Sequence, residues 1–103
     1  MALSHLKGGA ILAPMAGVTD RVFRRLCRRE GCVLAYTEMV SAKGLCHGNA
    51  ATARLMAVDD DETAVVLQLF GSEPAVFEQA LTVIDREKFA AIDINMGCPV
   101  RKV

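Results

Sequence analysis

The sequence has no excess of charge, no CxxC pair and no apolar run long enough to cross a membrane. Twelve Lys and Arg residues balance twelve Asp and Glu residues, so the overall charge neither favours nor excludes an anionic partner. No window approaches the roughly 18 apolar residues of a membrane span, and the first residues lack the pattern of a signal peptide. We therefore expect a cytoplasmic protein without a membrane partner.

The four cysteines also argue against a secreted or metal-dependent protein. They are Cys27, Cys32, Cys46 and Cys98. An even count is weak support for disulfides without a secretory context, and we expect reduced thiols. Cys46 and His47 are neighbours, but two ligands are too few for a metal ion, and no metal site is expected.

Four short apolar runs divide the chain. They cover residues 10–13, 33–37, 64–69 and 90–94. Because they are continuously apolar rather than alternating, they are typical of strands that are covered on both faces, as in parallel sheets. Helical patterns lie between them, which predicts the order β-α-β-α-β-α-β. At 103 residues and 52% hydrophobic content, the chain is one domain at most and has enough apolar residues for a core.

Two helices have clear start signals. Asp20 is a good N-cap for the first and Gly31 a good stop, whereas Ser72-Glu73-Pro74 opens the second. The first helix would have an apolar arc of Val22, Phe23, Leu26 and Cys27 and an opposite arc of Arg21, Arg24, Arg25, Arg28 and Arg29. We expect its arginine face to be solvated rather than bound to RNA. Between Ser41 and Met56 we expect a short turn and a helix from about Asn49.

The spacing of the runs fits both a (β/α)8 barrel and a doubly wound sheet. The segment after the first run, residues 13–20, lacks the GxGxxG turn of a dinucleotide-binding unit, which argues against the second fold. Polar or unusual residues follow the C-terminal ends of all four runs, where barrels house their chemistry. These residues are Pro14, Met15, Thr37, Glu38, Gln68, Asn95 and Cys98.

The segment from Asn95 to Lys102 places an amide, a thiol and two cations on the loop after the last run. Gly97 permits close approach of a ligand, and Asn95 offers a donor and an acceptor to a planar, amide-like partner such as a base or a flavin ring. On composition alone, Cys98 is equally well explained as a small buried hydrophobe.

Four motifs carry a family resemblance. They are LAPMAGVTD at 12–20, TEMV at 37–40, LQLFG at 67–71 and DINMGCP at 93–99. One alone would be unspecific, but the four in this order resemble the bacterial tRNA-dihydrouridine synthase family over essentially the whole chain. The resemblance implies an α/β fold, a partial TIM (β/α)8 barrel of about the first three and a half βα units (strands 1 to 4). Residues 1–103 would be the truncated N-terminal portion of an FMN-binding domain.

The resemblance further implies reduction of the C5–C6 double bond of a uridine in tRNA, with FMN as cofactor and NADPH as reductant. Pro14, Met15 and Ala16 match a segment that lies against the flavin through its backbone, and Gln68 matches a flavin-contacting side chain. Without the resemblance, Gln68 is better explained as a residue that satisfies neighbouring backbone groups.

The substrate side of the expected site lies in the last motif. Asn95 matches a residue near the uracil, and Cys98 matches the proton donor. A thiol with an ordinary pKa of about 8.5 is mostly protonated near neutral pH yet can release its proton. Arg101 and Lys102 follow it directly and could meet flavin or RNA phosphates, although cations close to a thiol also tend to lower its pKa.

Two alternatives remain open from the sequence. One is another flavin-dependent barrel that reduces a free pyrimidine or an enone. The other is a truncated, non-catalytic protein that binds RNA or a partner through its arginine-rich helix. Because half a barrel has unpaired strand edges and lacks the later phosphate-binding loops, we expect the 103-residue chain alone not to be an active synthase.

Overall fold

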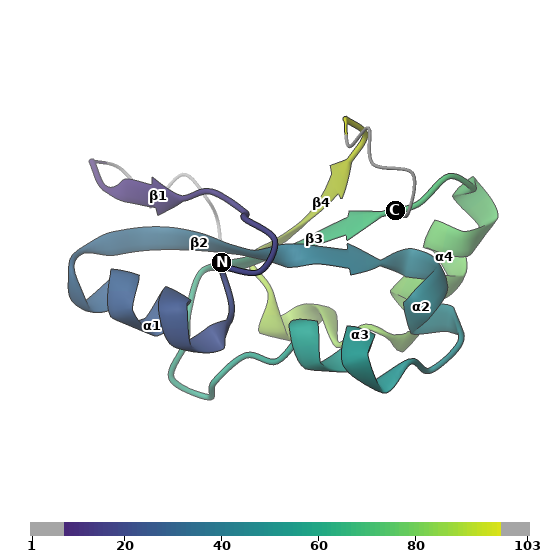
Figure 1. Ribbon diagram of the computed structural model, residues 1–103, viewed down its shortest axis with the longest axis horizontal. Helices are drawn as coiled ribbons and strands as arrows, with labels where there is room; N and C mark the ends of the chain where they lie inside the picture. The colour runs from purple at the N-terminus through teal and green to yellow at the C-terminus, as the bar shows by residue number, and fades with distance from the viewer. Residues whose placement is uncertain (1–7, 98–103) are drawn as a thin grey trace.

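A computed structural model describes residues 8–97, which form one four-stranded parallel sheet (Figure 1). The strands follow one another across the sheet in chain order. They are β1 (Ala10–Leu12), β2 (Cys32–Ser41), β3 (Val65–Phe70) and β4 (Ala91–Asn95). The α/β class and the four predicted strands are therefore confirmed, although β2 continues past its expected end at Thr37.

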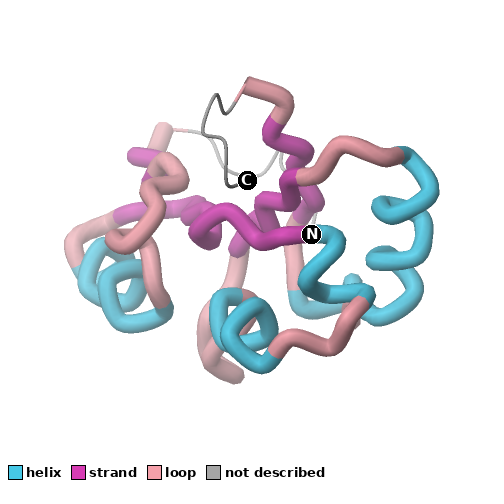
Figure 2. Tube along the Cα trace, turned by 45° about the vertical axis from the view of Figure 1, so that its right-hand side comes forward, coloured by secondary structure: helices cyan, strands magenta, loops and turns pink. Residues whose placement is uncertain are grey.

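Helices connect the strands and lie on one side of the sheet (Figures 1 and 2). They are α1 (Arg21–Arg29), α2 (Ala42–Cys46), α3 (Ala50–Leu55), α4 (Pro74–Val83) and the 3-10 helix η2 (Arg86–Lys88). Asp20 caps α1 as predicted, because its carboxylate accepts a hydrogen bond from the Phe23 N–H at 2.8 Å. Asn49 likewise caps α3, but the turn expected before it is the short helix α2.

The main core lies between the sheet and helices α2 and α4. Its buried members are Val40, Ala42, Leu45, Leu67, Leu69, Ala80 and Ile84. Since Leu67 and Leu69 point toward the helices, the residues that alternate with them on β3, Val66 and Gln68, point to the opposite side. We call that side the distal face. Val66 packs there in a second cluster with Leu34 and Ala64.

Strand β2 contains one residue more than the stretch of β3 beside it. Tyr36 pairs with Val66, whereas the next pair is Met39 with Gln68. The two strands thus advance by unequal numbers of residues, as in a β-bulge. Thr37 lies within this bulge and is fully buried, and its hydroxyl accepts a hydrogen bond from the Gln68 N–H at 3.1 Å. The backbone donor that the irregular ladder leaves at Gln68 is therefore satisfied by a side chain.

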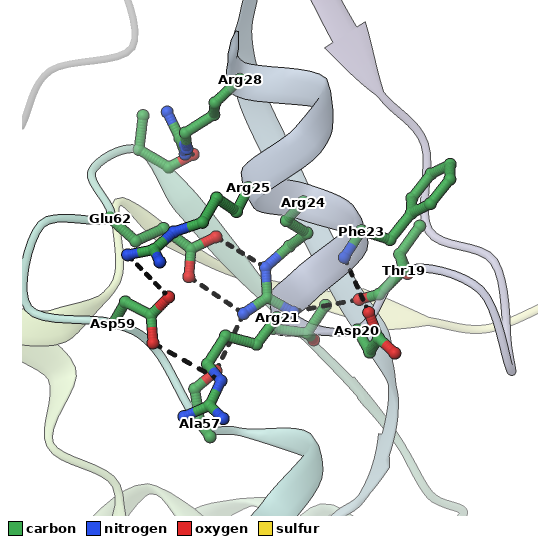
Figure 3. A network of polar contacts seen from close by, with 12 residues as sticks. Thr19, Asp20, Arg21, Phe23, Arg24, Arg25, Arg28, Ala57, Asp59 and Glu62 are labelled. Carbon is green, nitrogen blue, oxygen red and sulfur yellow. Dashed lines mark hydrogen bonds and ion pairs between the residues drawn. The ribbon is translucent and has the colours of Figure 1, made fainter.

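Helix α1 is oriented differently from the sequence-based expectation. Arg24, which we expected on a solvated face, is 1% exposed, whereas Val22 and Leu26 of the apolar arc are 62% and 52% exposed. The arginine side faces the loop between α3 and β3, which contains Asp59, Asp61 and Glu62 (Figure 3). A helical wheel cannot reveal this, because the acidic partner of Arg24 lies 38 residues further along the chain.

The guanidinium of Arg24 is enclosed by oxygen atoms (Figure 3). Its Nε and Nη2 donate to the two carboxylate oxygens of Glu62 at 2.7 and 3.0 Å. Its remaining contacts are to the carbonyl oxygens of Thr19 at 3.0 Å and Ala57 at 2.8 Å. The two charged side chains are only 1% and 5% exposed. Arg24 therefore fastens α1 both to the loop before it and to the loop before β3.

We predict that Arg24→Met in the full-length protein that carries this segment lowers the free energy of unfolding by about 3–5 kcal/mol, because Glu62 would keep a buried charge without its partner. Arg21→Met is the matched control. The ion pair of Arg21 with Asp59 has side chains that are 55% and 23% exposed, so its loss should cost about 1 kcal/mol or less. Chemical denaturation of both variants measures the difference, and equal effects would contradict the prediction.

Candidate functional site

The C-terminal ends of the four parallel strands lie along one edge of the sheet, which we call the rim. The loop after β1 begins at this edge and Asn95 ends β4 there, whereas Glu38, Met39 and Gln68 lie within β2 and β3, shortly before these strands end at Ser41 and Phe70. Parallel pairing places these segments, far apart in the sequence, beside one another. The parallel topology brings the predicted polar residues toward one edge, but Thr37, Glu38 and Gln68 lie inside their strands rather than after them.

The loop after β1 is a compact turn. The carbonyl oxygen of Met15 accepts hydrogen bonds from the N–H groups of Val18 and Thr19, both at 3.0 Å. The Thr19 hydroxyl closes the turn, since it donates to the same carbonyl and accepts from the Met15 N–H, both at 3.2 Å. Met15 therefore has both backbone groups engaged inside the turn, while its side chain is 41% exposed.

A carboxylate from β2 holds the same loop at the rim. Glu38 Oε1 accepts a hydrogen bond from the backbone N–H of Gly17, whose φ is +75°. A residue with a side chain is strained at that φ, so glycine suits the position. The segment Pro14 to Ala16 precedes this anchor directly, and its place relative to β2 is fixed by it.

Among the predicted site residues within 8–97, Gln68 is the most deeply buried, at 5% exposure. Its Nε2 donates to Asp93 Oδ2 on β4 at 3.2 Å, and the two residues are paired in the sheet register. Its Oε1 is buried and has no hydrogen-bond partner among residues 8–97. The simpler interpretation expects the Gln68 amide to satisfy neighbouring backbone groups, but within residues 8–97 it donates to a side-chain carboxylate, and its carbonyl oxygen is left over.

Asn95 also lies on the distal face, two positions after Asp93 on β4. Its Nδ2 contacts the sulfur of Met39 at 3.2 Å, and its Oδ1 accepts a hydrogen bond from the Gly97 N–H at 2.9 Å. The amide thus orients the start of the loop after β4. One Nδ2 hydrogen and one Oδ1 lone pair are not used by these two bonds.

Three of the predicted site residues lie outside the described part of the chain. They are Cys98, Arg101 and Lys102. The described chain ends at Gly97, one residue before Cys98.

The arginines of α1 are largely committed to protein contacts. Arg21 and Arg25 form ion pairs with Asp59, and Arg25 also contacts Asp61. Arg28 donates to the carbonyl oxygen of Ala64 at 2.9 Å. The helix therefore does not present a row of unpaired cations, which removes the main argument for the alternative of RNA binding through this helix.

Neither a metal centre nor a membrane span is found in residues 8–97. No three His, Cys, Asp or Glu side chains within this range are grouped so that they could hold an ion. Cys46 instead points to the carbonyl oxygen of Val76 at 3.5 Å. No helix within the same range is long and apolar enough to cross a membrane.

Sequence reasoning missed two carboxylates. Glu38 holds the loop that contains Gly17, a role that its motif does not indicate. Asp93 was counted as part of an apolar run, although it contacts Gln68. A signal for Asp93 is present in the sequence, because a single charged residue between Ile92 and Ile94, in a strand that is expected to be buried, requires a partner.

Comparison with known proteins agrees with the motifs. The family model described as Dihydrouridine synthase (Dus) matches residues 11–103. The chain is 47% identical over 102 residues to a probable tRNA-dihydrouridine synthase of Aquifex aeolicus (strain VF5), which covers 98% of this chain and 32% of the relative. It is 39% identical over 99 residues to a probable tRNA-dihydrouridine synthase of Treponema pallidum (strain Nichols), covering 95% and 29%.

A third relative is tRNA-dihydrouridine synthase B of Vibrio cholerae serotype O1, which is 40% identical over 99 residues, covering 96% of this chain and 31% of the relative. The chain thus spans about a third of the length of the curated relatives that it matches. With a family match that runs from β1 to Val103 and relatives aligned over nearly every residue, the chain belongs to the dihydrouridine synthase family.

Proposed function

We propose that this chain is part of an FMN-dependent tRNA-dihydrouridine synthase that reduces the C5–C6 double bond of a uridine in tRNA, with NADPH as reductant. The observation that carries the proposal is the family match over residues 11–103 together with relatives named tRNA-dihydrouridine synthase. Such an enzyme acts in the cytoplasm, where tRNA and NADPH are available.

The fold that we infer for the whole domain is a (β/α)8 barrel, of which residues 1–103 form the N-terminal portion with strands 1 to 4. Two features support it. The strands are parallel and in chain order, and the helices lie on one side of the sheet. A doubly wound sheet would reverse its strand order and place helices on both faces. In a barrel, the rim would be the edge that holds the active site.

Gln68 is where the fit to FMN can be judged. Leaving a buried acceptor without a donor costs about 1–3 kcal/mol, and the Oε1 of Gln68 is such an acceptor within residues 8–97. An isoalloxazine ring carries an N–H between two carbonyl groups, which would satisfy it. The residues present therefore fit the cofactor at this point.

The loop after β1 supplies the second contact in this proposal. Because Met15 uses its N–H and its carbonyl oxygen within the turn, the backbone donor that we assign to the flavin is the N–H of Ala16. It makes no hydrogen bond to the residues that the structure describes. Pro14 and the Met15 side chain would lie against the ring as apolar surface.

FMN, when bound and reduced, supplies the hydride that C6 of the uracil receives. This chain must then provide a proton to C5, and we assign that step to the Cys98 thiol. The thiolate that remains would take up a proton from solvent afterwards. The support for Cys98 is its position in the sequence, three residues after Asn95, which is the last residue of β4. Asn95 would contact the uracil, and Arg101 and Lys102 would meet phosphates.

The proposal is tested on the full-length protein that carries this segment. Purified protein should show the absorbance of bound FMN, and NADPH should reduce uridine in tRNA but not free uracil or a simple enone. Absence of flavin would favour a binding protein without turnover. Reduction of free uracil in preference to tRNA would favour a flavin enzyme with a different substrate.

We predict that Cys98→Ala keeps FMN but lowers dihydrouridine formation by about 10²- to 10⁴-fold, because the general acid is removed while the flavin contacts remain. Cys27→Ala, which removes a half-buried thiol from α1, is the matched control and should leave the rate unchanged. Single-turnover assays on tRNA lacking the modification measure both rates. Near-normal turnover of Cys98→Ala would rule out this thiol as the required proton donor.

We predict that Gln68→Leu weakens FMN binding by about 5- to 150-fold, which corresponds to an N–H left unpaired in a buried site. Because the change also removes the amide partner of Asp93, stability is measured beside affinity. Gln79→Leu on the exposed side of α4 is the control for the same substitution. Fluorescence titration of the apoprotein gives the affinities, and an unchanged affinity with altered stability would assign Gln68 a structural role only.

A further inference from the structure

Gln68 and Asp93 form a cross-strand pair on the distal face of the sheet. They are register partners on β3 and β4, and their side chains are joined by the hydrogen bond from Gln68 Nε2 to Asp93 Oδ2 at 3.2 Å. Gln68 is 5% exposed and Asp93 is half-buried. The side-chain amide of Gln68 can adopt few other orientations, because neighbouring residues enclose it.

The chemistry of the two groups fixes which end of the amide faces which way. A carboxylate can only accept hydrogen bonds, whereas an amide has a donating NH2 end and an accepting carbonyl end. Turning the amide over would bring its oxygen against the carboxylate and would forfeit the bond. Asp93 therefore holds the NH2 end toward β4, and the carbonyl oxygen Oε1 is directed away from it.

No group on the neighbouring strand β2 favours the opposite orientation of the Gln68 amide. The register partner of Gln68 on β2 is Met39, whose thioether offers no donor and instead contacts the Asn95 amide. The Thr37 hydroxyl accepts from the Gln68 backbone N–H and donates to the carbonyl oxygen of Glu38. Within residues 8–97, nothing donates to Oε1.

We propose that Asp93 is a positioning residue that makes position 68 an obligate hydrogen-bond acceptor toward the ligand. The site would thereby select a ligand that presents an N–H at this point and reject one that presents only a lone pair. This inference rests on the proposed function, in which the ligand is FMN. The oxidised flavin ring has a single ring N–H, at N3, so the acceptor would fix which edge of the ring lies against β3.

The test compares FMN with 3-methyl-FMN, which lacks this N–H, by titration of the apo form of the full-length protein. In the unchanged protein, methylation should weaken binding at least tenfold. In Asp93→Asn, the new amide can either donate or accept, so the orientation of Gln68 is no longer imposed. FMN should then bind several-fold more weakly, and its advantage over 3-methyl-FMN should shrink at least fivefold.

A double variant provides a rescue that a merely structural role would not produce. In Asp93→Asn with Gln68→Glu, the amide is placed on β4 and the carboxylate on β3, so one carboxylate oxygen accepts the cross-strand bond and the other faces the ligand. The preference for FMN over 3-methyl-FMN should return. Asp60→Asn, in the exposed loop before β3, is the control and should change neither affinity.

The outcomes separate this inference from the function beneath it. If Gln68→Leu weakens FMN binding but Asp93→Asn keeps the original preference for FMN over its methyl analogue, the positioning role is overturned and the flavin site stands. If the unchanged protein binds neither compound, both are overturned. Should Asp93→Asn fold poorly, the preference measured in the double variant decides, because its loss there also contradicts the proposal.

Discussion

A buried guanidinium must be surrounded by hydrogen-bond acceptors. In this chain that requirement holds together the loop before α1 and the loop before β3. Arg24 satisfies it with Glu62 and with the carbonyl oxygens of Thr19 and Ala57. Thr19 in turn closes the turn around Met15. The Arg24 guanidinium on α1 thus helps to position the loop that we assign to the flavin, and Glu38 on β2 holds the same loop. The loop is held from two sides although it has no regular secondary structure.

The elements could be predicted from local signals because burial and capping act over short distances. The apolar runs became strands, and Asp20 and Asn49 became caps at the expected positions. The orientation of α1 could not be predicted, because it depends on Glu62, which the sequence separates from Arg24 by 38 residues. A charged face on a helix such as α1 predicts exposure to solvent. The acidic loop opposite this face is what buries Arg24 instead.

The motifs name residues for the candidate site but do not give its geometry. Gln68 and Asn95 were expected at the rim, and they lie on the distal face of adjacent strands. Their directions depend on Asp93 and Met39, which two of the motifs contain but to which the resemblance assigns no role. Asp93 takes the NH2 end of Gln68, and Met39 receives that of Asn95. The amide groups are therefore oriented by residues to which no ligand contact is assigned, so a list of site residues understates how much of the sheet the site requires.

The extra residue in β2 decides which side chains of that strand reach the site. Before the bulge, Tyr36 lies beside Val66 on the distal face, and after it Met39 lies beside Gln68 while Val40 turns into the core. The residues of β2 that face the distal side are therefore even-numbered before the bulge and odd-numbered after it. A strand of this length without the bulge would bring Glu38 beside Gln68 and turn the Met39 thioether toward the helices. The single extra residue therefore decides which side chain occupies every later position of the strand.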